Sequence, residues 1–138
     1  MLPAGTQETT VAKAVLIIGE DPKLVDFSAP GVPSNMSVEK VMDGLNGSRE
    51  RLEGLGYPTS ILLTRDAETV EAQVSQALRK NHYDIVVIGA GLRTLPPMAA
   101  QFEKLMDALH KEAPDAEFAF NSRPDDSDAA ALRWLKRE

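Results

Sequence analysis

The sequence predicts an α/β fold in which helices cover both faces of a four-stranded parallel sheet, a three-layer α/β/α sandwich. Two observations support this prediction. Apolar runs such as residues 85–88 lack polar alternation, which is typical of strands buried on both faces. Segments with apolar residues at three- and four-residue steps, typical of amphipathic helices, alternate with these runs along the chain.

The predicted strands are short apolar runs with glycine, proline or polar residues at their ends. They span residues 12–18, 57–64, 83–88 and 116–120. The segment 20–37, between the first strand and the first helix, contains three prolines and a glycine. We therefore expect it to be irregular and to contain no long helix or strand.

The predicted helices carry an apolar stripe and span residues 37–55, 66–81, about 96–110 and about 125–138. Ser37 and Asp66 are suitable N-caps for the first two helices. Pro96 and Pro97 fit the first turn of the third, where an N–H is not needed. Gly44 and Gly47 weaken the middle of the first helix, so they either let another element approach closely or mark a kink.

Alternation of strands and helices implies right-handed crossovers. We predict the strand order 2-1-3-4, a flavodoxin-like and more broadly Rossmann-like layout that lacks a fifth strand. The length of 138 residues suits one domain. We assign residues 1–11 to a flexible N-terminal tail and residues 12–138 to a single α/β domain.

The composition excludes several classes of function. A net charge of −6 disfavours binding to nucleic acid or to anionic membranes, which requires a basic face. The absence of cysteine excludes disulfides, thiolate catalysis and zinc–thiolate or iron–sulfur sites. No apolar run approaches the roughly 18 residues of a membrane span, and the first residues do not resemble a signal peptide. We expect a cytoplasmic protein without a metal or cofactor.

A ligand site is expected at the carboxyl ends of the strands, where the strand order reverses. For the order 2-1-3-4 this point lies between strands one and three. The loops that follow strands one, three and four should meet there. The candidate ligand-binding residues in these loops are Gly19, Glu20, Asp21, Gly89, Gly91, Arg93, Thr94, Asn121, Ser122 and Arg123.

The stretch IVVIGAGLRTLPP, residues 85–97, begins like a dinucleotide-binding turn but does not continue as one. The fingerprint requires Gly-x-Gly-x-x-Gly at a helix N-terminus. Here Thr94 replaces the third glycine, and two prolines delay the helix and remove N–H groups. We therefore predict no dinucleotide site. Gly89 and Gly91 can adopt positive φ and turn the chain sharply off the strand.

The charged residues near the expected crevice leave two interpretations open. Arg93 would pair with a carboxylate or phosphate of a ligand. Alternatively, it would form a salt bridge to Glu20, Asp21 or Asp26 across the crevice. Glu20 and Asp21 could also act as an acid or base. Neither histidine is expected nearby.

Four stretches resemble short, uncharacterised bacterial proteins: IGAGLRTLPP (88–97), FEKL (102–105), HKEAP (110–114) and FNSRP (120–124). The resemblance covers nearly the whole chain after the tail. It implies a bacterial single-domain α/β protein and supplies no activity and no site residues.

Three hypotheses about function follow. The first is a binding module for a small polar or anionic ligand in the crevice between strands one and three. The second is a homo-oligomeric interaction protein, for example a homodimer, with a vestigial crevice. The third is an enzyme that uses Glu20 or Asp21 as an acid or base. The methionine pairs that would suit a contact between copies are Met36 with Met42 and Met98 with Met106.

Overall fold

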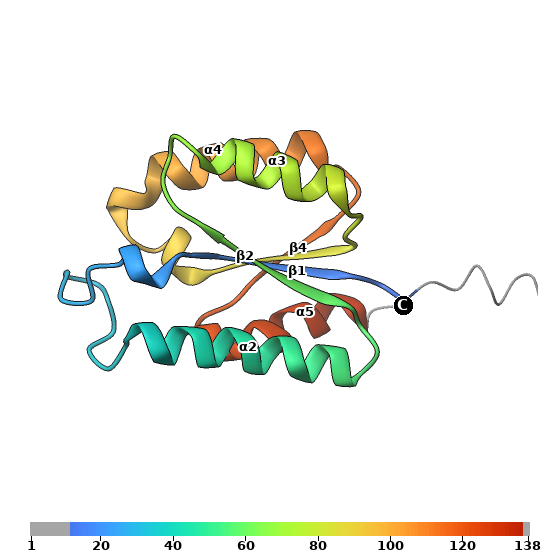
Figure 1. Cartoon of the computed structure of the whole chain (residues 1–138), viewed down its shortest axis with the longest axis horizontal. Helices are drawn as coiled ribbons and strands as arrows, with labels where there is room; N and C mark the ends of the chain where they lie inside the picture. Colours follow the sequence, from blue (N-terminus) through green and yellow to red (C-terminus); the bar gives the residue numbers. More distant parts are fainter. Residues whose placement is uncertain (1–11, 137–138) are drawn as a thin grey trace, which may run out of the picture.

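A parallel sheet with helices on both faces organises the computed structural model, which describes residues 12–136 (Figure 1). The sheet pairs its strands in the order β2-β1-β3-β4, all parallel. The strands are β1 (Val15–Glu20), β2 (Thr59–Thr64), β3 (Ile85–Ile88) and β4 (Glu117–Phe120). The predicted three-layer architecture and strand order are confirmed. The predicted tail, residues 1–11, lies outside the described residues.

Helices α3 and α4 cover one face of the sheet, and α2 and α5 cover the other (Figure 1). Their bounds are α2 (Val38–Gly54), α3 (Val70–Lys80), α4 (Ala99–Glu112) and α5 (Ser127–Leu135). Short 3₁₀ helices lie in the loops: η1 (Pro22–Leu24), η2 (Ala90–Leu92), η3 (Pro96–Met98) and η4 (Pro124–Asp126). None of the helices within residues 12–136 has the length and apolar character that a membrane span requires.

The central strand β1 explains why its sequence is apolar without alternation. Leu16 and Ile18 pack in the core beneath α3 and α4, whereas Val15 and Ile17 pack in the core beneath α2 and α5. All four side chains are essentially inaccessible to solvent. Burying each such side chain stabilises the fold by about 1.5–3 kcal/mol, so both faces of the strand select apolar residues.

Two predicted caps are seen, one of them in an altered role. Ser37 caps α2, because its hydroxyl accepts the N–H of Lys40 at 3.1 Å. The carboxylate of Asp66 accepts the N–H of Thr69 at 2.8 Å, but the regular helix begins only at Val70. Asp66 therefore caps a turn that leads into α3, so the prediction placed the helix start a few residues too early.

Gly44 allows η4 to lie directly against α2. A Cβ atom at Gly44 would lie 2.9 Å from both the backbone nitrogen of Asp125 and the Cβ of Pro124. Helix α2 continues through this glycine from residue 38 to residue 54. Of the two predicted alternatives, the close approach of another element is confirmed at Gly44, whereas a Cβ at Gly47 would meet the side chain of Arg51 from the same helix.

Polar side chains on the same face of α2 fasten this contact. The buried Ser48 donates its hydroxyl to the carbonyl of Pro124 at 3.1 Å and to the carboxylate of Asp128 at 3.2 Å. The guanidinium of Arg51 donates to the same carboxylate at 2.8 Å. We call Gly44, Ser48, Arg51, Pro124 and Asp128 the α2–α5 seam.

The methionines expected at a contact between copies have packing partners within the chain. Met42 packs against the core beneath α2 and α5. Met98 and Met106 pack against the core beneath α3 and α4. Met36 lines the cavity described below.

Candidate functional site

The sheet opens between β1 and β3 at the carboxyl ends of these strands. Strand β1 pairs with β3 only as far as Ile18 opposite Ile88, and the N–H of Gly89 then donates to the carbonyl of Ile18 at 2.9 Å. Beside β2, however, β1 continues to Glu20 opposite Thr64. Strand β1 therefore ends two residues later than predicted. Beyond residue 88 the chain turns into η2, which opens the sheet at the reversal of strand order.

The glycines at this opening do not act through positive φ, so that prediction was wrong. Gly89 has a φ of −69°, and among the described residues positive φ occurs at Gly31 and Gly56 only. Gly89 is needed instead for close approach, because a Cβ there would lie 3.1 Å from the carbonyl oxygen of Ile18. At Gly91 an added Cβ would meet nothing within 4 Å.

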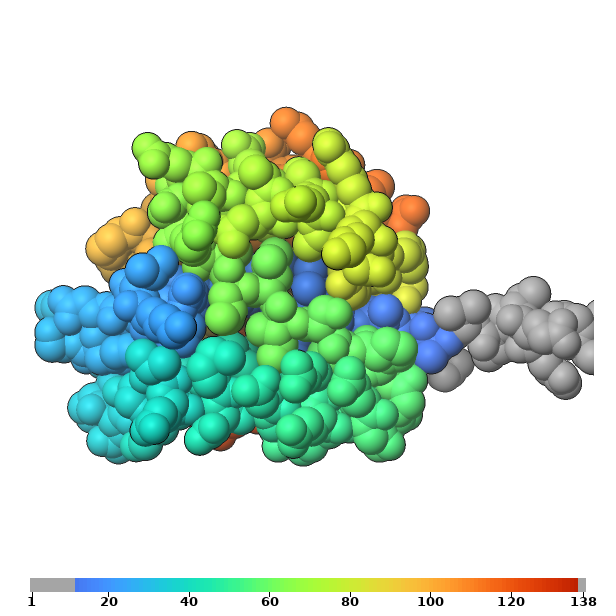
Figure 2. Space-filling model, viewed as in Figure 1, coloured from blue at the N-terminus to red at the C-terminus, as the bar shows by residue number. Residues whose placement is uncertain are grey.

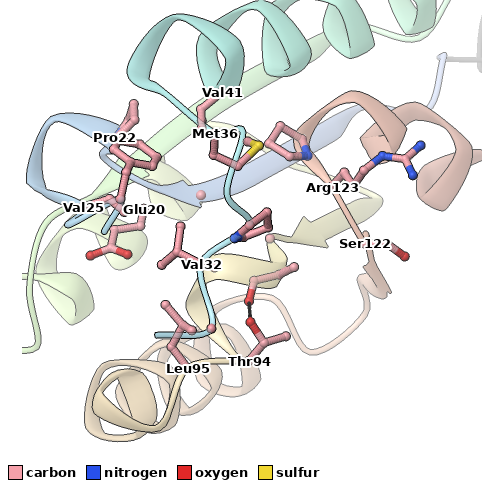
Figure 3. A pocket seen from close by; sticks show the side chains of 18 of the residues that line it. Glu20, Pro22, Val25, Val32, Met36, Val41, Thr94, Leu95, Ser122 and Arg123 are labelled. Atoms are coloured by element: carbon pink, nitrogen blue, oxygen red, sulfur yellow. Dashed lines mark hydrogen bonds between the residues drawn. The ribbon is translucent and has the colours of Figure 1, made fainter. Parts of the chain in front are cut away.

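A cavity of about 280 Å³ lies at the opening (Figure 3). Its wall combines the end of β1, segment 21–37, the first turns of α2, η2 with the residues after it, and the loop after β4. Val25, Val32, Met36 and Leu95 supply much of the apolar wall (Figure 3). Segment 21–37, light blue in Figure 2, forms the outer surface of this end of the molecule.

The predicted site residues divide into two groups. Those that line the cavity are Gly19, Glu20, Gly89, Gly91, Thr94, Ser122 and Arg123, whereas Asp21, Arg93 and Asn121 lie outside the lining. The hydroxyl of Ser122 and the guanidinium of Arg123 point away from the apolar side chains (Figure 3). Arg123 forms an ion pair with Asp125 at 3.0 Å. The Thr94 hydroxyl donates to the carbonyl of Ala90 at 2.9 Å.

Sequence reasoning missed most of the apolar wall. The lining residues that were not among the candidates include Val25, Phe27, Val32, Met36, Val41, Leu45 and Leu95. One signal was available. Segment 20–37 was expected at this end of the sheet, and it contains apolar residues although it forms neither a long helix nor a strand. Apolar residues in an irregular segment are expected to pack against an apolar surface, which here is the wall of the cavity.

Glu20 brings an unpartnered carboxylate to the cavity. Its side chain is half-buried and forms no hydrogen bond or ion pair with any of residues 12–136. Burial raises the pKa of the Glu20 carboxyl, and the negative charge of Asp21 raises it further. Asp21, in contrast, uses its carboxylate to accept the N–H of Lys23 at 3.0 Å, which caps η1. Glu20 is therefore the acidic group that is available to a ligand.

Within the described residues, the side chain of Arg93 contacts the end of β4 and the loop after it. Its guanidinium donates to the carbonyl of Asn121 and lies over the ring of Phe120, 5.1 Å from the centroid. Burial lowers the pKa of the Arg93 guanidinium, while the charge of Asp126 acts in the opposite direction. Within residues 12–136, Arg93 forms none of the salt bridges that were expected across the crevice. Arg93 instead holds the loop after β4.

Asn121 also serves the fold. Its side-chain oxygen accepts the N–H of Ala90 at 2.8 Å, and its side-chain nitrogen donates to Ser127 at 2.8 Å. The residue is buried. Asn121 thus connects η2 to the start of α5 and fixes one wall of the cavity without facing it.

The chemistry available at the cavity is limited. Within residues 12–136, no group of three or more histidine, aspartate or glutamate side chains could hold a metal ion. The ionisable side chains in the wall are Glu20 and Arg123, and Arg123 is already paired. An apolar cavity with one free carboxylate can enclose a small molecule and can accept or release one proton.

No family model matches the chain, and no curated protein matches it in sequence. Among solved structures, the chain is similar to a "putative lipoprotein from Peptoclostridium difficile 630 (fragment)". The similarity covers 89% of this chain and 94% of the fragment, with 18% sequence identity and a TM-score of 0.46. At this level of likeness, no property of the fragment transfers to the present chain.

Proposed function

We propose that this protein binds a small molecule in the cavity between β1 and β3. The observation that carries the proposal is the meeting of separate chain segments in one apolar wall at the reversal of strand order. An apolar wall in contact with water is unfavourable by about 25 cal/mol per Å², and a ligand that covers the wall recovers this free energy. The volume of about 280 Å³ is near the lower limit for ligand pockets, so the ligand is small.

The ligand has a mainly apolar body. The sequence favoured a polar or anionic ligand held by Arg93, but the guanidinium of Arg93 bonds to the loop after β4. The cavity wall is rich in valine, leucine and proline side chains and also includes Phe27 and Met36. The free carboxylate of Glu20 disfavours an anion beside it. These features support an apolar body with at most one polar end.

Segment 21–37 covers the cavity, and its few hydrogen bonds to the rest of the fold support a route by which a ligand enters. Among the described residues, residues 22–36 hydrogen-bond only with one another and with Asp21. The segment therefore contacts the rest of the fold mainly through apolar side chains. At its tip, a Cβ at Gly31 would lie 2.8 Å from Leu95, so the two residues meet closely across the cavity. Opening the segment would break no strand pairing, and we propose that the ligand enters this way.

The experiment that tests this function compares the binding of a small molecule before and after a large side chain from segment 21–37 fills the cavity. We expect millimolar 2-phenylethanol to shift the backbone amide signals of Gly19 and Gly89 in ¹H–¹⁵N NMR spectra. The variant Val32→Trp places a large ring in the wall and should abolish these shifts. The matched control is Leu24→Trp, because Leu24 belongs to the same segment, is 55% exposed and does not line the cavity.

Two results would contradict the proposal. One is the absence of shifts with 2-phenylethanol and with similar uncharged fragments. The other is a set of shifts around the smaller hollow at the opposite end of the sheet, whose wall includes Asn81 and Ala113. That hollow has a volume of about 120 Å³ and serves as an internal control for unspecific binding.

We further propose the setting that the sequence favours, a bacterial cytoplasmic protein with a flavodoxin-like layout. The strand order 2-1-3-4 with a crevice at its reversal is a feature that flavodoxin-like folds share. The cysteine-free composition suits a reducing compartment. Localisation of a tagged chain in the native cell by fractionation tests this setting.

A further inference from the structure

We infer that the cavity selects molecules with a protonated amine on a small apolar body, and that the Glu20 carboxylate is the counter-ion. The inference rests on the binding function proposed above and names the class of its ligand.

The unpartnered state of Glu20 is the first step. A carboxylate in a partly dry, apolar setting is unfavourable unless a donor or a cation accompanies it. Within residues 12–136 the Glu20 side chain forms neither a hydrogen bond nor an ion pair. Other carboxylates near the carboxyl ends of the strands have partners, such as Asp21 with the Lys23 N–H and Asp126 with the Ser122 N–H. The Glu20 carboxylate is therefore the acidic group in the wall that a ligand can pair with in exchange for water.

The arrangement of positive charge is the second step. An anionic ligand would need a cation that faces the cavity. Arg123 is the cationic side chain in the wall, but it is paired with Asp125 and points away from the apolar side chains (Figure 3). Arg93 donates to the carbonyl of Asn121. Of the two ionisable side chains in the wall, Glu20 thus carries the charge that is not paired within the described residues, which favours a cation over a carboxylate or a phosphate as its partner.

The kind of cation follows from the number of oxygen ligands and from the volume. Divalent metal ions require several oxygen ligands, and the described residues provide no acidic group of three. An ammonium group needs only one carboxylate and can donate its other hydrogens to carbonyl groups or water. A cavity of about 280 Å³ holds on the order of nine groups of the size of a water molecule. A small primary amine with an aromatic or branched aliphatic body meets these limits.

The test compares three molecules with the same body and different ends: 2-phenylethylamine, 2-phenylethanol and phenylacetate. Dissociation constants are measured by NMR titration at pH 7. We expect the amine to bind at least about tenfold more tightly than the alcohol, and the acid to bind most weakly. In Glu20→Gln the amine and the alcohol should bind within about twofold of each other. In the matched control Asp21→Asn, the preference for the amine should persist.

The outcomes separate this inference from the proposed function. Equal binding of amine and alcohol to the unaltered protein would overturn the inference and leave the proposed function standing. A preference for the amine that survives in Glu20→Gln would also overturn it. No binding of any of the three molecules would overturn both. Binding of the alcohol to Glu20→Gln shows that the variant keeps its cavity, and the comparison in the unaltered protein does not depend on that variant.

Discussion

The α2–α5 seam and the cavity both place a carboxylate where the chain leaves regular structure, but the two carboxylates differ in their partners. Asp128 in the seam accepts from Arg51 at 2.8 Å and from Ser48 at 3.2 Å. The hydrogen bond from Arg51 is the main reason why the pKa of Asp128 lies below its usual range, and the bond from Ser48 lowers it further. Glu20 in the cavity has no partner among residues 12–136, and burial raises its pKa.

This difference shows how a structural acid can be distinguished from one that is available for function. A carboxylate whose bonds are completed by the fold contributes to stability and leaves no room for a ligand. A carboxylate that the fold partly buries without a partner reduces stability, and such groups gather at functional sites. The same contrast separates two glycines, because Gly44 is covered by Pro124 and Asp125 whereas Gly91 has open space in front of it.

The largest effect is expected at the glycines. Gly44→Ala should lower the free energy of unfolding by about 2 kcal/mol, because the new methyl group would lie 2.9 Å from the backbone of Asp125 and from Pro124. Gly91→Ala should change it by about 0.5 kcal/mol or less, since the methyl group meets no atom within 4 Å. Urea unfolding measures both values. Equal stability of the two variants would show that the seam is not tightly packed.

A smaller effect is expected when the charge of the seam is removed. Asp128→Asn should lower the free energy of unfolding at pH 7 by about 1 kcal/mol, because a charge-assisted bond from Arg51 is lost. The pKa of Asp128 is lowered by folding, so its contribution is fully present above the unfolded pKa of about 3.9 and is lost as the pH falls from there through the lower folded pKa. Urea unfolding at pH 7 and at pH 3 measures this loss.

The matched control in the same loop is Asp125→Asn. Asp125 pairs with Arg123 at 3.0 Å, but the two side chains are 60% and 68% exposed. Such pairs contribute little, so the change should stay within about 0.5 kcal/mol. If Asp125→Asn lowered the free energy of unfolding as much as Asp128→Asn does, the hydrogen bonds of the seam would stabilise the fold no more than an exposed ion pair does.

The sequence predicted those features that depend on periodicity and topology. Residues 15–18 are apolar because both faces of β1 are covered, and this leaves a pattern that can be read without a structure. The crevice between β1 and β3 follows from the strand order alone. The sequence marked Gly44 and Gly47 as unusual inside a helix, but it did not distinguish Gly44, against which η4 packs, from Gly47, which no other element approaches closely.

The chemistry of the cavity could not be predicted in the same way. In segment 21–37 no repeat determines which side chains turn inward, so Val25 and Val32 could not be told from exposed neighbours such as Leu24. Arg93 has a long, flexible side chain, and its partners Phe120 and Asn121 are brought near it only by the pairing of β3 with β4. The sequence predicted that the charge of Arg93 lies near the crevice. It did not predict the direction in which the guanidinium points.

The smallest effect, and the one with the opposite sign, is expected at Glu20. Glu20→Gln should raise the free energy of unfolding at pH 7 by about 0.5 kcal/mol, because an unpartnered charge is removed from a half-buried position that is still partly screened by solvent. Folding raises the pKa of Glu20. Its carboxyl therefore favours the folded state fully below the unfolded pKa of about 4.3, and this contribution is lost as the pH rises through the folded pKa.

The gain in Glu20→Gln should accordingly be absent near pH 4, appear above pH 5 and level off towards neutral pH. Urea unfolding of both proteins across this range measures the profile. A loss of stability at pH 7, like that expected for Asp128→Asn, would show that Glu20 has a partner in the fold and would remove the contrast between the two carboxylates. Added 2-phenylethylamine should reverse the order of stability at pH 7, because it binds the protein that retains the Glu20 carboxylate more tightly than Glu20→Gln and therefore stabilises that protein more.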